Sequence, residues 1–530
     1  MTLQLDLAMV TTRRWAQWAL TAALVVCALA LAVRTLAGPL YFRSPLNVES
    51  AIGLAATLLL LLRATTGQTT AEPARRRPGG WDAFAILLIA GLVAAVFWRS
   101  ASFYFLSDDF ILVKQAKSFL YSFRGLFATA GADGSYRPFT HFYMSVAYKW
   151  AGTNPNHWHW TEFAIHTANS ILVFVVARML GFSRFCAAFA SALFAVHGTR
   201  PEAVVWLAGR ADLLAAFFVL LGLASFIRFW SREGGTAWLW VALMSMTLGI
   251  LSKESAYTFA LLLVVFLASK NALRTRRALY ALIPFLVVTA SLVAWRISVL
   301  GGVGGYRNQS GRSEALSLSV ITVVKALVLR LIAILFFPVS WSHKPNAIFG
   351  VIMILYLAAL IWLTRARVRW QAFMIPLGFL LVLALPPLPQ LLIGPDLQKA
   401  RLLYLPAMGF CLLLATAVEG LKPRPQWAIA ITILVFNIAA LFHNLSAWGE
   451  AAEKARTACS MAAACPNKVE VRGLPGSLNG VYFFANGFQE CLEMQRNKDA
   501  SQAFDRSQHP CVLSWDSKTE QLSRVPYDIH

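Results

Sequence analysis

Two adjacent carboxylates, Asp108 and Asp109, follow a strongly apolar passage in the segment FLSDDF at 105–110. A carboxylate placed against an acceptor hydroxyl can act as a general base. The same residues could instead cap the helix that begins near Phe110, because a side-chain oxygen satisfies free backbone N–H groups and a negative charge favours a helix N-terminus. Adjacent side chains on a helix do not face each other, so we expect the two acids to have different roles.

Several cations lie near the ends of other apolar segments. Arg and Lys can neutralise a phosphate leaving group, Arg through two parallel hydrogen bonds and Lys as a point charge. A carboxylate pair with several cations on the same side is the minimum set for transferring a group from a lipid phosphate to a hydroxyl. We expect Asp108 to be the general base and Asp109 to orient the base or the acceptor. The candidates for phosphate and donor contacts are Arg137, Arg210, Lys253 and Arg401.

A second set of residues could bind the acceptor or support the site, and comprises His166, His197, Glu202 and Glu254. Both sets have structural alternatives. Arg137 could order its loop against lipid headgroups, and a single His at a helix end is often a hydrogen-bonded packing residue. The residues that could form structural ion pairs at helix ends are Arg210 with Asp212 and Lys253 with Glu254. His157, His159 and Glu162 match no strong metal-ligand spacing, so the sequence leaves the metal unknown.

The elements that must position these residues are membrane helices. The chain has 530 residues, of which 58% are hydrophobic and only 14% are charged, and its mean hydropathy is +0.60. About 20 apolar residues cross the hydrocarbon core of a bilayer, and runs of this kind recur from residue 15 to residue 445. They predict an all-α polytopic membrane protein with about 13 transmembrane helices. The segment 316–338 carries Lys325 and Arg330, so we expect it to lie along the outer interface as an amphipathic helix.

The formal net charge of +22, from 47 Lys and Arg against 25 Asp and Glu, reports membrane topology. The positive-inside rule assigns Lys- and Arg-rich loops to the cytoplasm. If each apolar run crosses the membrane once, all the basic clusters lie on the same side of it: 13–14, 75–77, 270–277, 365–369 and 422–424. We therefore expect a multi-pass protein of the inner (plasma) membrane with a cytoplasmic N-terminus and no nucleic-acid partner.

With a cytoplasmic N-terminus and an odd number of crossings, the polar segment 446–530 is predicted to be extracytoplasmic, on the same side as the candidate site. It holds four of the seven Cys residues, as expected for a domain with two disulfides in an oxidising compartment: Cys459, Cys465, Cys491 and Cys511. Four thiols allow three pairings, and the sequence does not select one. The predicted domains are 1–79, with N-terminal spans and a basic cytoplasmic loop; 80–445, the catalytic membrane domain with its first outer loop at 99–162; and 446–530, a small extracytoplasmic C-terminal domain.

A transporter or flippase for a lipid-linked or anionic solute is the alternative function. Such a protein would distribute ionisable groups through the membrane thickness and would show inverted repeats or broken helices. Here the ionisable groups outside the predicted cytoplasmic loops gather at one face. This pattern favours a site that meets a lipid headgroup from the side and an acceptor from above. A third alternative function is that of a non-catalytic assembly scaffold.

Six motifs resemble, in order and spacing, the membrane part of the transmembrane and TPR-containing O-mannosyltransferases and their bacterial relatives. That family belongs to the GT-C class of polytopic glycosyltransferases. The motifs are FLSDDF, SYRPFTHFYMSVAY, HWTEFAIHTANSIL, LFAVHGTRPEAVVWLAGRADLLAAFF, LSKESAYTFALLL and ARLLYLPAMGFCLLLA. The chain departs from the family in showing no period of about 34 residues after residue 425, and in two additional N-terminal spans. These departures leave the acceptor open, and family membership does not fix the sugar.

The resemblance implies a GT-C fold and an inverting hexosyl or pentosyl transfer from a polyprenyl-phosphate sugar. The acceptor would be a hydroxyl of a protein, a cell-envelope glycan or a lipid, and the C-terminal domain would help to recognise it. Asp108 and Asp109 match the acidic pair of the family, Arg137 the Arg of SYRP, and Arg401 and Tyr404 the late R-x-x-Y-L-P motif. Tyr404 therefore joins the donor-binding candidates. The resemblance implies membrane lipids as partners, fixes no cofactor besides the donor substrate, and leaves a divalent metal open.

Overall fold

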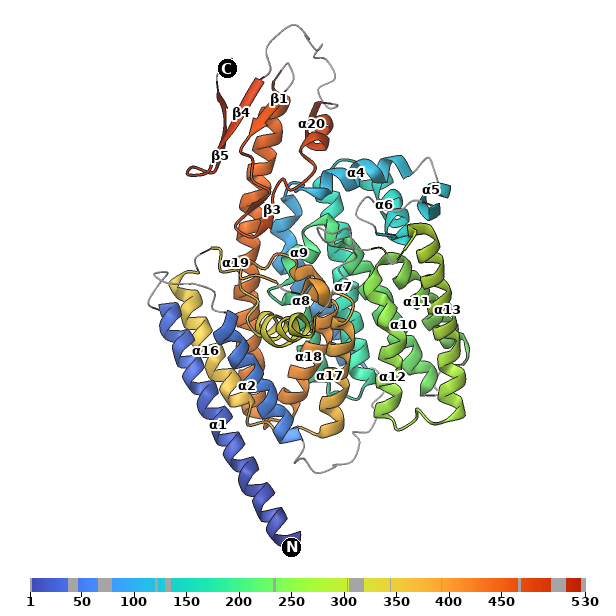
Figure 1. Cartoon of the computed structure of the whole chain (residues 1–530), viewed down its shortest axis with the longest axis vertical. Helices are drawn as coiled ribbons and strands as arrows, with labels where there is room; N and C mark the ends of the chain where they lie inside the picture. The colour runs from blue at the N-terminus through green and yellow to red at the C-terminus, as the bar shows by residue number, and fades with distance from the viewer. Residues whose placement is uncertain are drawn as a thin grey trace.

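The computed structural model describes a bundle of helices that carries a small region of strands at one end (Figure 1). The described residues are 2–36, 46–64, 79–119, 123–128, 135–231, 235–302, 304, 319–343, 345–391, 393–465, 469–496 and 511–525. The helices of the bundle are α1 (Thr2–Leu36), α2 (Leu46–Ala64), α3 (Gly80–Phe97), α7 (Pro155–Met179), α8 (Arg184–Val196), α10 (Arg210–Trp230), α11 (Ala237–Ser252), α12 (Phe259–Ser269), α13 (Arg276–Leu300), α16 (Ala347–Leu363), α17 (Trp370–Ala384), α18 (Pro406–Glu419) and α19 (Pro423–Ala463). The basic loop expected at 75–77 lies outside the described residues.

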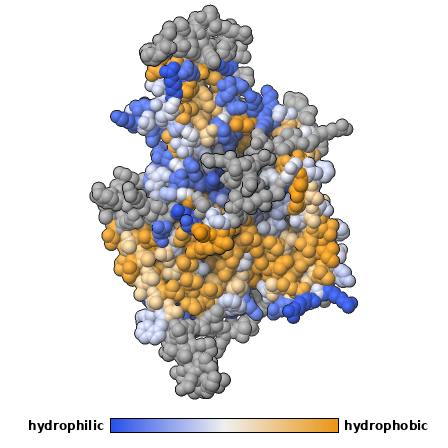
Figure 2. All heavy atoms as spheres, in the orientation of Figure 1, coloured by the Kyte–Doolittle hydropathy of each residue, from blue (hydrophilic) through white to orange (hydrophobic). Residues whose placement is uncertain are grey.

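On the face seen in Figure 2, a belt of hydrophobic residues crosses the bundle, with hydrophilic residues above it toward the C-terminal region. Within the described ranges, seven helices are long and apolar enough to cross a membrane: α1, α2, α3 with its continuation to Ser102, α7, α10, α13 and α19. Six further apolar helices are shorter, namely α8, α11, α12, α16, α17 and α18, with α12 counted together with the turn before it. The prediction of a multi-pass, mostly helical membrane protein is confirmed.

Helices α10 and α18 occupy the interior of the bundle. Both are apolar on every side and both are buried over nearly their whole length, as expected for helices in a core. Helix α10 packs against α7 and α11, and α18 packs against α8 and α17. Gly409 permits the close approach of α17, because a Cβ at this position would lie 2.4 Å from the backbone N of Leu380.

The segment predicted to lie along the interface forms one continuous helical stretch in its described part, from residue 320 to residue 336. It comprises α14 (Val320–Val324), a π-helical part (Lys325–Leu331) and α15 (Ile332–Phe336). Figure 1 shows this yellow stretch end on, across the mainly vertical helices of the bundle. Its beginning is exposed, since Val320 is 80% accessible, whereas Ile334 near its end is fully buried. Residues 316–318 lie outside the described residues, and an interfacial position stays a prediction.

Short helices and turns gather at the end of the bundle that carries the strands, and four of them, α4, α5, α6 and α9, are labelled there in Figure 1. They belong to the connections between bundle helices, where polar backbone can be satisfied without entering lipid. Their bounds are η2 (Trp98–Ser102), α4 (Asp108–Phe119), α5 (Phe123–Ala128), α6 (Pro138–Ala151), α9 (Arg200–Val204), η3 (Leu207–Gly209), η4 (Glu254–Thr258), η7 (Leu388–Gln390) and η8 (Ala400–Leu403). These connections supply most of the candidate site residues.

The C-terminal region, 446–530, begins within α19, because this helix continues beyond the predicted boundary at 446 to Ala463. Strand β1 (Val469–Arg472) pairs in parallel with β4 (Cys511–Asp516), which pairs antiparallel with β5 (Gln521–Val525). A hairpin joins β2 (Ser477–Leu478) to β3 (Val481–Tyr482), and α20 (Phe488–Arg496) follows it. The disulfide Cys459–Cys491 connects α19 with α20, and Cys465–Cys511 connects the segment just after α19 with β4. They resolve the pairing that the sequence left open, and the strands add a β element to the expected all-α architecture.

Candidate functional site

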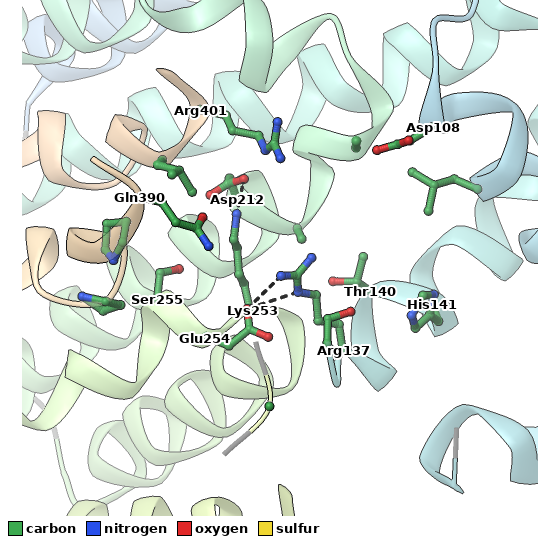
Figure 3. A pocket seen from close by; sticks show the side chains of 18 of the residues that line it. Asp108, Arg137, Thr140, His141, Asp212, Lys253, Glu254, Ser255, Gln390 and Arg401 are labelled. Atoms are coloured by element: carbon green, nitrogen blue, oxygen red, sulfur yellow. Dashed lines mark hydrogen bonds and ion pairs between the residues drawn. The ribbon is translucent and has the colours of Figure 1, made fainter. Parts of the chain in front are cut away.

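A cavity of about 760 Å³ opens at the end of the bundle that carries the C-terminal region. Five of the predicted site residues line it, although they come from four separate motifs of the sequence: Asp108, Arg137, Lys253, Glu254 and Arg401. Figure 3 shows their side chains around a common space. The cavity therefore brings a carboxylate and several cations together, which is the set that the sequence analysis required for group transfer.

Asp108 is the first residue of α4 and faces the cavity. Its Oδ1 accepts a hydrogen bond of 2.8 Å from the side-chain amide of Asn486, which belongs to the C-terminal region and also lines the cavity. The carboxylate is thus held on one side by a neutral donor. Among the described residues, no ion pair involves Asp108, so its geometry suits a group that exchanges a proton at the cavity surface.

Asp109 points away from the cavity into the protein and is 1% exposed. Its Oδ2 accepts the N–H of Leu106 at 3.1 Å, and its own N–H donates to the Leu106 carbonyl at 3.0 Å. Burial raises the pKa of the Asp109 carboxyl well above its ordinary value, and the Leu106 N–H partly offsets this by favouring the charged form. In the structure Asp109 fixes the turn that presents Asp108, and the two acids point in different directions.

Glu254 connects two arginines at the cavity wall. Arg137, which directly precedes α6, lies 3.0 Å from Glu254 Oε2, and Arg296 of α13 lies 2.9 Å from Glu254 Oε1. Arg296 lines the cavity but was not among the predicted site residues. A signal for it is present in the sequence, because a lone Arg inside an apolar helix is costly unless it has a partner or a function.

Lys253 and Asp212 form a second ion pair at the cavity, with Nζ and Oδ2 2.5 Å apart. Lys253 leaves the end of α11, whereas Asp212 lies in the first turn of α10. The alternative pairing of Lys253 with Glu254, which adjacency in the sequence suggested, is not the one that forms. Asp212 also lines the cavity, so it joins Arg296 as a wall residue that the prediction had not placed in the site.

Arg401 reaches the cavity from η8 and is held by Glu202 of α9. Their side chains approach to 2.6 Å, and the Arg401 guanidinium lies 4.6 Å from the centre of the Trp206 ring. Glu202 is 4% exposed, so burial raises its carboxyl pKa, while the charge of Arg401 acts in the opposite direction. Glu202 does not line the main cavity, and its role in the structure is to hold Arg401.

Arg210 does not reach the cavity, although it lies in the same turn of α10 as Asp212. It forms an ion pair with Glu162 of α7 in which both side chains are fully buried. Its guanidinium also lies 4.6 Å from the centre of the Trp158 ring and donates to Thr161 Oγ1 at 2.9 Å. The structural alternative for Arg210, an ion pair, is thus realised with Glu162 rather than with Asp212.

Tyr404, His166 and His197 are buried in the bundle and do not line the cavity. The Tyr404 hydroxyl and His166 Nδ1 are 2.7 Å apart, and His166 Nε2 lies 3.0 Å from the Ala195 carbonyl. His197 Nε2 lies 3.0 Å from the Leu335 carbonyl. These hydrogen bonds correspond to the packing role given as the alternative for both histidines.

Part of the cavity lining is apolar. It includes Val293 and Ile297 of α13, which are 38% and 44% exposed, and three prolines of the segment LPPLPQ: Pro386, Pro387 and Pro389. The same lining holds the cations and carboxylates, and Arg296 lies between Val293 and Ile297 on α13. Such a combination suits a ligand with a charged group and an apolar part. Among the described residues, no group of three or more His, Cys, Asp or Glu side chains could hold a metal ion.

The fold and the site together describe a polytopic membrane protein with a charged cavity at one end of its bundle. No family model matches the chain. Curated protein O-mannosyl-transferases are similar to it in sequence. Tmtc1 of Drosophila melanogaster is 38% identical over 134 residues, which cover 25% of this chain and 15% of the relative. TMTC3 of Homo sapiens is 28% identical over 186 residues, which cover 33% and 20%.

A protein O-mannosyl-transferase of Caenorhabditis elegans matches over a longer region, with 25% identity over 346 residues that cover 61% of this chain and 48% of the relative. The matched regions therefore span about half of the relatives' length or less. The predicted resemblance to the transmembrane O-mannosyl-transferases is confirmed.

Two solved structures are also similar to the chain. The oligosaccharyltransferase of Archaeoglobus fulgidus in complex with Zn and sulfate is 14% identical, with a TM-score of 0.44, and the match covers 71% of this chain and 55% of that one. ArnT from Cupriavidus metallidurans bound to undecaprenyl phosphate is 15% identical, with a TM-score of 0.41, covering 82% and 93%.

Proposed function

We propose that the chain is a GT-C class membrane glycosyltransferase that transfers a sugar from a polyprenyl phosphate to an extracytoplasmic hydroxyl. One observation carries this proposal: Asp108 and four cations, Arg137, Lys253, Arg296 and Arg401, line a single cavity. The sequence resemblance to protein O-mannosyl-transferases supports the reaction class, and it makes mannose the first sugar to test. The proposed location is the inner membrane, with the cavity and the C-terminal region outside.

In the proposed reaction, the acceptor oxygen attacks the anomeric carbon of the donor while its proton passes to Asp108. The bond between the anomeric carbon and the phosphate oxygen breaks, and both electrons leave with the polyprenyl phosphate. Displacement from the opposite side inverts the anomeric centre. Arg and Lys side chains that face the leaving group stabilise the negative charge that develops on it, so the cations that line the cavity are the proposed phosphate contacts.

The apolar part of the lining gives the donor a place for the start of its lipid chain. Val293 and Ile297 of α13 are partly exposed, and α13 is apolar enough to span the membrane. A donor whose isoprenoid runs along this helix would bring its phosphate to the Arg296 end of the cavity. The acceptor would then approach from the side of Asp108 and the C-terminal region.

The test is turnover by purified protein with a panel of radiolabelled polyprenyl-phosphate sugars. We expect sugar release or transfer with at least one donor, and a decrease of about 10²- to 10⁴-fold in Asp108→Asn, because a neutral amide cannot accept the proton. Asp516→Asn, at an acid of strand β4 that does not line the cavity, is the matched control and should retain activity.

The proposal fails if wild-type protein shows no turnover with any donor under conditions in which a known GT-C enzyme is active. It also fails if Asp108→Asn turns over as fast as wild type. Solute or lipid movement across vesicles without any sugar transfer would favour the transporter alternative.

A further inference from the structure

The loop 483–487 of the C-terminal region lies directly on the turn that presents Asp108. The Ser107 N–H donates to the Phe483 carbonyl at 2.9 Å, and the Asn486 N–H donates to Ser107 Oγ at 3.2 Å. The rings of Phe484 and Phe110 stack with their centres 6.1 Å apart. Residues more than 370 positions apart in the chain thus form one continuous hydrogen-bonded unit.

A glycine makes this close approach possible. Gly487 has φ +81°, and a Cβ added there would lie 2.2 Å from the Ser107 carbonyl O. Ser107 itself has φ +47°, so both segments of the chain adopt a left-handed backbone conformation where they meet. Such backbone conformations are costly for residues other than glycine and persist only where the surrounding contacts require them.

Asn486 extends from this loop to the carboxylate at the cavity. Its Nδ2 donates to Asp108 Oδ1 at 2.8 Å, and both residues line the cavity. The terminal torsion of an Asp side chain has a broad preference, so an isolated carboxylate rotates easily. A donor on one oxygen fixes the plane of the carboxylate and leaves the other oxygen to accept a proton.

We propose that Asn486 is a positioning residue for the transfer reaction, so that the C-terminal region completes the catalytic site. This inference rests on the proposed function of Asp108. Other contacts hold the region in place without reaching the cavity: Gln495 Nε2 donates to the Tyr104 hydroxyl at 2.7 Å, and Lys114 pairs with Glu493 at 2.7 Å. The Cys459–Cys491 disulfide fixes α20 to α19.

The experiment compares two variants of Asn486 with a matched amide variant, Gln495→Ala. Misplacement of a reacting group by about 1 Å can cost about 10²-fold in rate. We therefore expect Asn486→Ala to lower kcat about 10- to 100-fold, while the donor KM changes less than about twofold because donor contacts are kept. Asn486→Asp should lower kcat at least as much, because a carboxylate cannot donate and repels Asp108. Gln495→Ala should retain kcat.

A double variant separates positioning from folding. If Asn486 acts through Asp108, adding Asn486→Ala to Asp108→Asn should cause no further loss of the residual rate. Thermal unfolding and intact disulfides in each variant show that the region remains folded.

Three results would overturn the inference: Asn486→Ala with wild-type kcat, Asn486→Asp with wild-type kcat, or an equal loss in Gln495→Ala. The last would show that the loss comes from docking of the C-terminal region rather than from Asp108. An inactive Asp108→Asn beside a fully active Asn486→Ala overturns this inference alone. Wild-type protein without turnover overturns the proposed function, and the inference with it.

Discussion

Removal of Arg210 tests whether this residue stabilises the bundle or binds the proposed donor. Arg210 and Glu162 have no exposed side-chain surface, and they connect α10 to α7 in the interior of the bundle. Arg210→Ala leaves the Glu162 carboxylate buried without its partner. Breaking a fully buried ion pair in this way costs about 3–5 kcal/mol. Because about 1.4 kcal/mol is tenfold in an equilibrium constant, the ratio of folded to unfolded protein should decrease about 10²- to 10⁴-fold.

The comparison is Lys114→Ala, which breaks an ion pair whose side chains are 55% and 43% exposed. Exposed pairs contribute about 1 kcal/mol or less, so this variant should unfold nearly as wild type does. Unfolding by denaturant in detergent micelles, followed by tryptophan fluorescence, measures both changes. The double variant Arg210→Met with Glu162→Leu should recover much of the lost stability, because replacing a buried pair by apolar residues removes both desolvation costs.

Two results would refute this reasoning. An Arg210→Ala protein as stable as Lys114→Ala would show that the buried pair does not support the bundle. A double variant that is stable but has lost donor binding would assign Arg210 to the donor site, as the sequence analysis expected.

Three further predictions concern the cavity and the C-terminal region. Gly487→Ala should displace the turn before α4 and lower kcat about tenfold or more, whereas Gly476→Ala should be active, since its nearest contact would be 3.5 Å away; equal activities would contradict the argument. Cys491→Ser should destabilise the C-terminal region by about 2–5 kcal/mol, measured as faster proteolysis of that region; unchanged resistance would show that the disulfide is dispensable. Arg137→Ala should raise the donor KM at least about tenfold, and Lys114→Ala, outside the cavity, should leave it unchanged; an unaltered KM in Arg137→Ala would exclude Arg137 from the donor site.

The sequence predicts which end of the bundle carries the site, but it does not predict which side chains face the cavity. Arg210 and Asp212 show why. Two positions along an α-helix are separated by about 200° around its axis, so these neighbours face different ways: Asp212 lines the cavity, and Arg210 contacts α7. Both were sensible candidates by type and position. The choice between them depends on how α10 is rotated in the bundle, and packing against all its neighbours sets that rotation.

The role of the C-terminal region was predictable only in outline. Its cysteines and polarity indicated a disulfide-containing domain outside the membrane, and the structure supplies the two disulfides. Nothing in the motif order indicated that Asn486 would contact Asp108, because that contact depends on how the region docks on the bundle. Gly487 carried a weak signal, since a glycine next to an Asn indicates a turn. A turn signal does not indicate which segment the turn contacts.

Among the residues that the structure describes, each cation of the cavity lining pairs with an acid, and this has a consequence for selectivity. Arg137 and Arg296 share Glu254, Lys253 pairs with Asp212, and Arg401 pairs with Glu202. With Asp108, these residues carry four positive and four negative formal charges. A free inorganic anion therefore meets cations whose charge is largely offset by neighbouring acids, and it must compete with carboxylates that are already in place. If the proposed polyprenyl-phosphate sugar is the donor, its sugar and isoprenoid chain add binding energy along the cavity, and the site would select it over free inorganic phosphate.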